Sequence, residues 1–184
     1  MMRITALILM RGGLIVEFVL NTQRLAIRPF SKAFLADYYR EFTYEITKYQ
    51  YPDSFPHIEA ADRVMSGFVR DMEQGEMLEL VILTQGGEFL GSMEVFGLKE
   101  DTPEVGLWLK RSAHGAGYGR EALRRLLDHL NQTGKYRYYI YEADVRNTPS
   151  IRLIEKFHVE KGGCEDITTD SGKHLTLQTY RILC

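Results

Sequence analysis

Three alternating glycines, at positions 115, 117 and 119, are the residues of this sequence that point most directly to chemistry. They lie between an apolar run with strand character and a segment with the spacing of an amphipathic helix. Glycines let the backbone approach a ligand closely, and a helix that follows directs its unpaired N–H groups and positive dipole end into the loop. The pattern predicts a phosphate or pyrophosphate site, with a plain strand-to-helix turn as the alternative.

Basic residues surround this glycine loop. Glu121 is the one acid close to them in the sequence, and the basic residues are Lys110, Arg111, Arg120, Arg124 and Arg125. Such a neighbourhood attracts a polyanionic small molecule. The alternative is a solvated helix face, since Glu121 and Arg125 also have the i,i+4 spacing of a helical ion pair.

The whole-chain composition sets limits on partners and location. The length of 184 residues suits one domain. The net charge of −2 gives no indication of nucleic-acid binding. Cys164 and Cys184 do not suggest a disulfide, and no residues have metal-ligand spacing. We therefore expect a reduced, cytoplasmic protein without a metal.

The first 20 residues are apolar and form a separate N-terminal extension to a single domain at residues 21–184. Arg11-Gly12-Gly13 divides this extension into two arms, each shorter than the roughly 20 residues that a membrane-spanning helix needs. The arms predict a β-hairpin that covers the domain or pairs with another subunit in a homodimer, and no membrane partner. A translation start further along the chain is the alternative.

Hydrophobic periodicity and turn residues predict an α+β protein with a mixed sheet. Strands are expected at residues 24–28, 78–83, 88–96, 104–109, 136–143, 164–169 and 174–182. Helices are expected around 34–42, from Pro56 to residue 72, after the glycine loop to about residue 133, and at 150–157. A tyrosine-rich loop at 44–55 separates the first two helices. If the strands at 104–109 and 136–143 are parallel neighbours, the helix between them makes a right-handed crossover.

The glycine loop, read as residues 114–119, resembles the Gln/Arg-x-x-Gly-x-Gly/Ala signature of the GNAT superfamily of N-acetyltransferases. Residues 104–109 and 147–157 are similar to the strand and the Asn-x-x-Ser segment of the ribosomal-protein N-terminal acetyltransferase branch. Residues 22–30 are similar to that branch's first strand. The resemblance implies the GNAT fold, a mostly antiparallel twisted sheet of six to seven strands flanked by about four helices.

The resemblance also implies a substrate and a site. Acetyl-CoA would be the co-substrate, without a metal, and a primary amine of a small molecule or protein N-terminus would attack it directly in a ternary complex. Backbone groups of the glycine loop would hold the pyrophosphate and those of the preceding strand the pantetheine arm. The cofactor-binding residues would be Leu107, Trp108, Leu109, His114, Gly115, Ala116, Gly117, Tyr118, Gly119, Arg120, Asn147 and Ser150. The alternative for the last two is a turn in which Ser150 caps the helix.

Deprotonation of the amine requires a base near neutral pH. Glu104 is the candidate general base, because it begins the strand beside the thioester and matches a recurrent family glutamate, with Glu94 in reserve. Both would otherwise form an acidic wall that attracts a cationic amine. A backbone N–H near Leu109 is the candidate oxyanion donor. Tyr44, Tyr49, Tyr51 and Phe55 would frame the amine or anchor their loop to the core.

Three positions depart from the family pattern. His114 stands in place of Gln or Arg, Ile154 in place of a tyrosine that protonates the departing thiolate, and His158 in place of a glycine. Tyr139 and Tyr141 are the substitutes for the missing tyrosine. A non-catalytic acyl-CoA-binding domain of the same fold therefore remains the alternative to an N-acetyltransferase. A nucleotide hydrolase is excluded, since Arg120-Glu121 replaces the Lys-Ser/Thr of a P-loop.

Overall fold

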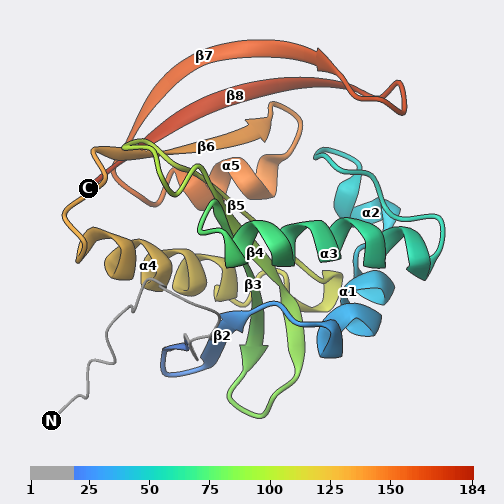
Figure 1. The fold of residues 1–184 in the computed structure, drawn as a ribbon. Coiled ribbons are helices and arrows are strands. Elements are labelled where there is room, and N and C mark those ends of the chain that lie inside the picture. Colours follow the sequence, from blue (N-terminus) through green and yellow to red (C-terminus); the bar gives the residue numbers. More distant parts are fainter. Residues whose placement is uncertain (1–18) are drawn as a thin grey trace, which may run out of the picture.

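A computed structural model describes residues 19–184, and the predicted hairpin of residues 1–20 lies almost wholly outside that range. The described chain forms a mixed α+β sheet protein, as predicted (Figure 1). Its strands are β1 (Leu20–Asn21), β2 (Leu25–Pro29), β3 (Met77–Thr84), β4 (Phe89–Phe96), β5 (Glu104–Leu109), β6 (Tyr138–Asp144), β7 (Val159–Thr168) and β8 (His174–Leu183). Its α-helices are α1 (Leu35–Glu41), α2 (Tyr44–Thr47), α3 (Ile58–Glu73), α4 (Tyr118–Asn131) and α5 (Thr148–Ile154).

The strands form one sheet in the order β1-β2-β3-β4-β5-β6-β8-β7. All neighbours are antiparallel except β5 and β6, which are parallel and joined through α4. The parallel pair is the one that the sequence suggested. The sheet has one strand more than expected, because the two-residue β1 pairs with β2 at its edge.

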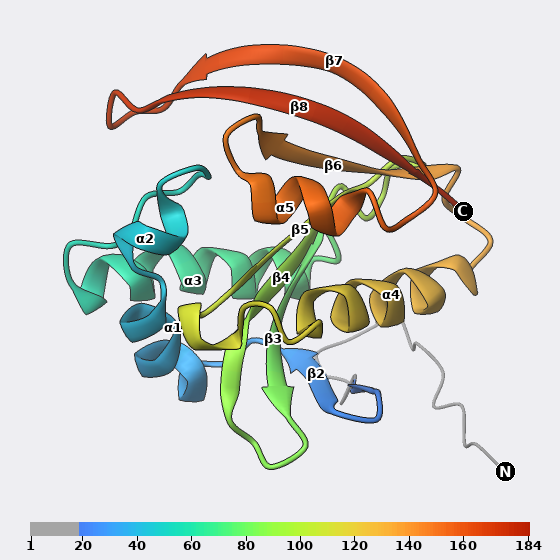
Figure 2. The same ribbon diagram turned by 180° about the vertical axis from the view of Figure 1, so that it is seen from behind.

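Helices cover both faces of the sheet. Helices α1 and α3 lie on one face, and α4 and α5 lie on the other (Figures 1 and 2). The α4 side holds the larger core, to which that helix contributes a buried stripe of Ala122, Leu123, Leu126, Leu127 and Leu130. The α1–α3 side holds a second, aromatic core around Tyr38, Phe42 and Trp108. Strands β3, β4 and β5 therefore contribute buried apolar residues to both cores.

Strands β5 and β6 separate soon after they meet. Their register contains the single pair Glu104↔Ile140, and the Ile140 N–H donates to the Pro103 carbonyl at 2.9 Å. Beyond this point β6, β8 and β7 arch away from the rest of the sheet (Figure 1). The later part of β5 consequently has an edge without a neighbouring strand, directly before the glycine loop.

Three local predictions are corrected. Part of the predicted loop at 44–55 forms α2, and α3 begins after His57, whose side chain accepts a hydrogen bond from the Ala60 N–H, rather than at Pro56. Strand β7 begins at Val159, five residues before the predicted start, because it pairs with β8 from Val159↔Ile182 onward. The hydrophobic pattern missed this extension because most β7 side chains are exposed.

Candidate active site

The glycine loop has the conformation of an anion-binding loop. Gly115 and Gly117 have φ values of 77° and 81°, in the left-handed region that favours glycine, and Gly117 is the N-cap of α4. The backbone N–H groups of residues 115–120 have no hydrogen-bond partner in the described part of the chain. A helix start with unpaired N–H groups attracts an anion through these donors and its dipole.

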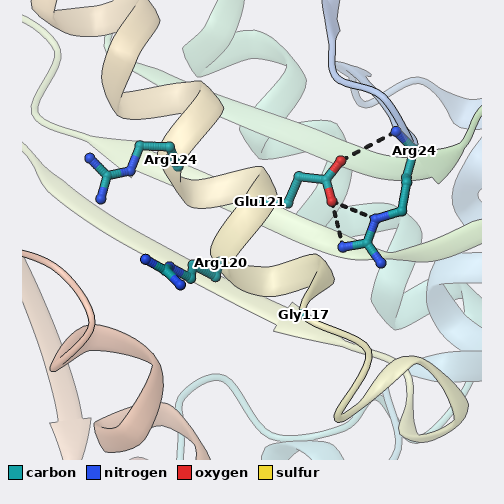
Figure 3. Close-up of a pocket in the computed structure, with 5 residues that line it drawn as sticks. All are labelled: Arg24, Gly117, Arg120, Glu121 and Arg124. Atoms are coloured by element: carbon teal, nitrogen blue, oxygen red, sulfur yellow. Dashed lines mark hydrogen bonds and ion pairs between the residues drawn. The ribbon is translucent and has the colours of Figure 1, made fainter.

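Three arginines and one glutamate surround the first turns of α4 and line a small pocket with Gly117 (Figure 3). Arg24, before β2, pairs with Glu121 at 2.7 Å, donates to the Ala116 carbonyl at 2.9 Å, and lies over the Tyr118 ring. Arg120 and Arg124 extend away from this pair and form no ion pair within residues 19–184 (Figure 3). Arg24 thus neutralises Glu121, whereas Arg120 and Arg124, the latter lying 4.9 Å from the centroid of the Phe157 ring, carry charges that no described carboxylate pairs.

The free edge of β5 presents its backbone to the opening between β5 and β6. Lys110 N–H donates to Leu90 on β4, so Trp108, two residues earlier, also faces β4, opposite Ser92. Leu107 and Leu109 therefore direct their backbone groups toward the opening. This corrects the expectation for Trp108, whose backbone belongs to the β4 ladder while its indole packs in the aromatic core.

His114 has partners within the protein. Its Nε2 lies 2.8 Å from the Leu109 carbonyl, and its backbone N–H donates to Arg111 at 3.3 Å. The side chain thus ties the glycine loop to the end of β5. Gly119 is buried, and a Cβ there would lie 3.3 Å from Leu107 Cδ1, so this glycine lets α4 pack closely on β5.

The opposite side of the opening is formed by α5. Asn147 is the N-cap of this helix and accepts a hydrogen bond from the Ser150 N–H at 3.3 Å, so Asn147 and not Ser150 is the cap. The Ser150 hydroxyl lies 2.9 Å from the Tyr141 hydroxyl of β6. Ile154 is fully buried in the main core. The Tyr139 hydroxyl instead bonds Asn131 at 2.6 Å, away from the opening.

A cavity of about 700 Å³ lies between α1, α3 and the sheet, and reaches the opening through Leu107, Asn147 and Ser150. Eight aromatic side chains contribute to its wall, among them Tyr38, Trp108 and Tyr141. Its acidic lining residues are Glu79, Glu94, Glu104, Glu142, Asp144 and Asp170, and no Lys, Arg or His among the described residues lines it. The cavity is therefore an aromatic and strongly acidic chamber.

Four of these glutamates follow one another across β3, β4, β5 and β6. Burial, and then the charge of Glu104, raise the pKa of Glu94 to about 7. Partial burial, and then the charge of Glu142, raise the pKa of Glu104 above its usual range, although the residue keeps an exposed surface. Burial and the charge of Glu94 raise the pKa of Glu79 well above its usual range. Carboxylates with raised pKa values are suited to accept a proton near neutral pH.

Comparison with known proteins identifies the family. The sequence matches the profile described as acetyltransferase (GNAT) domain over residues 24–160, which is well over half of the chain. The chain belongs to the GNAT acetyltransferase family. No curated protein matches the sequence significantly. The match begins at Arg24 and contains the glycine loop and the start of α5, so this GNAT domain includes the whole of the opening described above.

Solved structures share the fold of this GNAT domain. An apo RimL ribosomal L7/L12 α-N-protein acetyltransferase has a TM-score of 0.78 and 16% identity, covering 96% of this chain and 99% of that chain. Mycobacterium smegmatis RimJ in complex with CoA-disulfide has a TM-score of 0.77 and 19% identity, and the match covers 87% of this chain and 82% of that chain. Spermidine N-acetyltransferase from Vibrio cholerae in complex with CoA and spermine has a TM-score of 0.76 and 14% identity, and the match covers 88% of this chain and 96% of that chain. At these identities the likeness shows the fold alone.

The predicted acceptor loop has a mixed outcome in the GNAT domain. Tyr49 and Tyr51 line the cavity, whereas Tyr44 is exposed away from it and Phe55 stacks on Phe42 with ring centroids 5.6 Å apart. Lys173, in the β7–β8 turn, holds the loop by donating to Thr47 and Gln50 carbonyls at 3.0 and 2.6 Å and pairing with Asp53. Phe55 therefore anchors the loop to the core and Lys173 holds it beside the cavity, whereas contact of Tyr49 and Tyr51 with an amine stays a prediction.

Sequence reasoning missed Arg24, Glu79 and Glu142. Glu79 had a signal, because it is a lone acid within the apolar run of β3 and is buried there. Arg24 and Glu142 had no such signal. Arg24 pairs with Glu121, almost a hundred positions away, and Glu142 acts on Glu104 of the neighbouring strand. Groups of three or more metal-ligating side chains are absent from residues 19–184, and no helix there is long and apolar enough to cross a membrane.

Proposed function

We propose that this GNAT domain transfers the acetyl group of acetyl-CoA to a primary amine, which attacks the thioester directly while both substrates are bound. One observation carries the proposal. The acidic cavity meets the opening between β5 and β6, and that opening starts at a helix N-terminus with unpaired N–H groups. An anionic thioester and a cationic amine would therefore meet at one place.

The co-substrate would be held by the backbone. N–H groups of residues 115–120 would bind the pyrophosphate, and Arg120 and Arg124 would add charge at the same turns of α4. Leu107 and Leu109 would pair with the pantetheine amides like an added strand, and the Leu109 N–H would face the developing oxyanion. Asn147 and Ser150 would border the arm from the α5 side.

Glu104 would act as the general base. It lines the cavity at the point where β5 and β6 separate, and its raised pKa lets a carboxylate accept the ammonium proton near neutrality. The departing thiolate would take a proton from the Ser150 hydroxyl, the Tyr141 hydroxyl 2.9 Å away would return a proton to Ser150, and solvent would then reprotonate the Tyr141 phenolate. This pair of hydroxyls would supply the proton that a tyrosine provides in family members that carry one at the position of Ile154.

Two structural neighbours act on amines of different kinds. The Salmonella typhimurium structure is named as an acetyl transferase that modifies the N-terminal serine of ribosomal protein L7/L12, and the Vibrio cholerae structure as a spermidine N-acetyltransferase. A protein N-terminus and a small amine are both in keeping with the proposed reaction.

Acetyl-CoA turnover with a panel of amines tests the proposal. We expect Glu104→Gln to lower kcat/KM by roughly 10²- to 10⁴-fold without weakening CoA binding measured by calorimetry, because the glutamine keeps the shape but cannot accept a proton. Glu165→Gln, on the exposed strand β7, is the matched control for loss of one charge. A protein that binds CoA but acetylates no amine would instead be a non-catalytic acyl-CoA-binding domain.

A further inference from the structure

Two neighbouring carboxylates in the cavity wall have no cationic partner among residues 19–184. Glu79 is 1% exposed, and its hydrogen bond comes from the neutral Ser92 hydroxyl. Glu94 is its register partner on β4 and accepts no hydrogen bond from the described residues. Both line the cavity. Buried carboxylates without a cation are costly, so this pair is either protonated or compensated by a cation from outside the chain.

A glycine on the neighbouring strand provides space for one of these two carboxylates. Glu94 lies opposite Gly106 of β5, and a Cβ at Gly106 would collide with the Glu94 carboxylate. The glycine therefore makes the space in which that carboxylate sits on the cavity wall. Its position on β5, two residues after Glu104, places the carboxylate pair on the same face of the sheet as the proposed base.

The surroundings of the pair also suit a cation. The Trp108 indole, 5% exposed, lines the cavity, and Phe42 and Phe68 line it from α1 and α3. Aromatic faces attract ammonium groups, most strongly where water is excluded. The Trp108 N–H has no acceptor at normal hydrogen-bonding geometry, although it lies near enough to the Tyr38 hydroxyl to lower the pKa of that phenol against the raising effect of burial. A buried donor without an acceptor indicates that a ligand reaches this wall, but the atom that this N–H needs is an acceptor and not an ammonium group, so the cation is inferred from the carboxylates and the aromatic faces.

Strand spacing gives the separation between the two ends of the cavity. Glu94 lies one strand across and two residues along from Glu104, which puts their Cα atoms about 8 Å apart, and Glu79 lies about 12 Å away. The separation of about 8 Å between Glu94 and Glu104 is close to that between the two nitrogens of a short aliphatic diamine. It exceeds what a single ammonium group can bridge.

We infer that the acceptor is a small aliphatic amine with at least two ammonium groups, one acetylated beside Glu104 and a second held between Glu79 and Glu94. This inference rests on the proposed function and names its substrate class. A peptide N-terminus fits the pair less well, because it carries one ammonium followed by backbone carbonyls that need donors, whereas Glu79 and Glu94 offer only acceptors when ionised.

Paired acceptors of equal length test the inference. Cadaverine and pentylamine differ only in the second ammonium, and we expect kcat/KM to favour cadaverine by about tenfold or more, as close buried charge pairs do in other complexes. Glu94→Gln and Glu79→Gln should reduce that ratio to about one. Glu165→Gln should leave the ratio as it is in the wild type, because the residue lies outside the cavity.

Binding without turnover gives a second readout. With free CoA in place of acetyl-CoA, calorimetry should detect cadaverine binding and much weaker pentylamine binding, and circular dichroism should show that both glutamine variants are folded. Equal kcat/KM values for the two amines, or a higher value for an unblocked serine peptide, would overturn the inference while leaving acetyl transfer itself established. Absence of any amine acetylation would instead overturn the proposed function.

Discussion

Glu104 and Glu142 come from the two strands that separate, and each lines the acidic cavity. Their proximity gives the proposed base a neighbour of the same charge. The negative charge of Glu142 disfavours ionisation of Glu104 and adds to the effect of partial burial on its pKa. A base tuned in this way is ionised only above the usual range of a carboxyl group, so the rate of amine acetylation should depend on pH.

Glu142→Gln should shift the acidic limb of the kcat/KM profile. Removal of the Glu142 charge lowers the pKa of Glu104, so the ionised base persists to lower pH and the limb moves to lower pH. The shift should be a fraction of a pH unit to about one unit, because water screens part of the interaction. Steady-state rates across a pH series measure it, with Glu165→Gln as the control. A limb that stays in place would mean that another group limits the rate.

The Tyr141 and Ser150 hydroxyls are a second residue-scale feature, since they occupy the border between cavity and opening. Burial raises the pKa of Tyr141 to about 12, against the opposing effect of the Ser150 hydrogen bond, so the phenol stays protonated and able to donate. Its counterpart Tyr139 has the same chemistry in the wrong place, with its hydroxyl on Asn131.

Tyr141→Phe should lower kcat about tenfold or more, because loss of one proton donor weakens general acid catalysis, while the KM for acetyl-CoA changes little. The loss should be larger with a thioester whose leaving thiol is more basic. Tyr139→Phe removes a hydroxyl from the same strand and should keep the wild-type kcat. Equal kcat values for the two variants would assign the proton to water or to another group.

At the scale of elements, the start of α4 joins an anion site to a strand. Left-handed glycines at 115 and 117 turn the chain so that unpaired N–H groups converge, and Gly119 lets the helix pack on Leu107 and Leu109. The Arg24–Glu121 pair then braces the turn from the other side of α4 (Figure 3). Contacts within the protein therefore hold the loop in this conformation.

Gly117→Ala should raise the Kd for CoA by roughly tenfold, because a side chain in the left-handed region costs about 1–2 kcal/mol and shifts the loop away from its binding conformation. Calorimetric titration with CoA measures the change. Gly163→Ala, where β7 leaves open space around the Cβ, is the matched control. Unchanged affinity in Gly117→Ala would contradict the proposed role of the loop.

At the scale of the whole molecule, the buried carboxylates of the acidic cavity lower the stability of the fold. Glu79 and Glu94 lie in the cavity wall beside the aromatic core, and burial raises the pKa of both. The folded chain therefore binds more protons than the unfolded chain between the unfolded and folded pKa values. The free energy of unfolding must then fall as pH rises through that interval.

Glu79→Gln should accordingly stabilise the protein more at about pH 8 than at about pH 5. Ionisation of the buried glutamate lowers the free energy of unfolding at high pH, whereas the glutamine does not ionise. We expect the Tm to rise by a few degrees at the higher pH. Thermal denaturation at both values, with and without cadaverine, measures it. Cadaverine should raise the Tm of the wild type and much less that of the variant. A variant less stable than the wild type at high pH would contradict this account.

The amino-acid sequence by itself predicted the glycine loop and the order of most strands and helices, and its resemblance to GNAT motifs implied acetyl-CoA as co-substrate. These features depend on neighbours within a few residues, such as the alternating glycines ahead of an amphipathic helix, so a local pattern predicts them. Tertiary structure decided which carboxylates share the cavity, that Trp108 lines it, and that Tyr141 rather than Tyr139 meets Ser150. Strand register and the separation of β5 from β6 set these contacts, and both arise from packing between residues far apart in the chain.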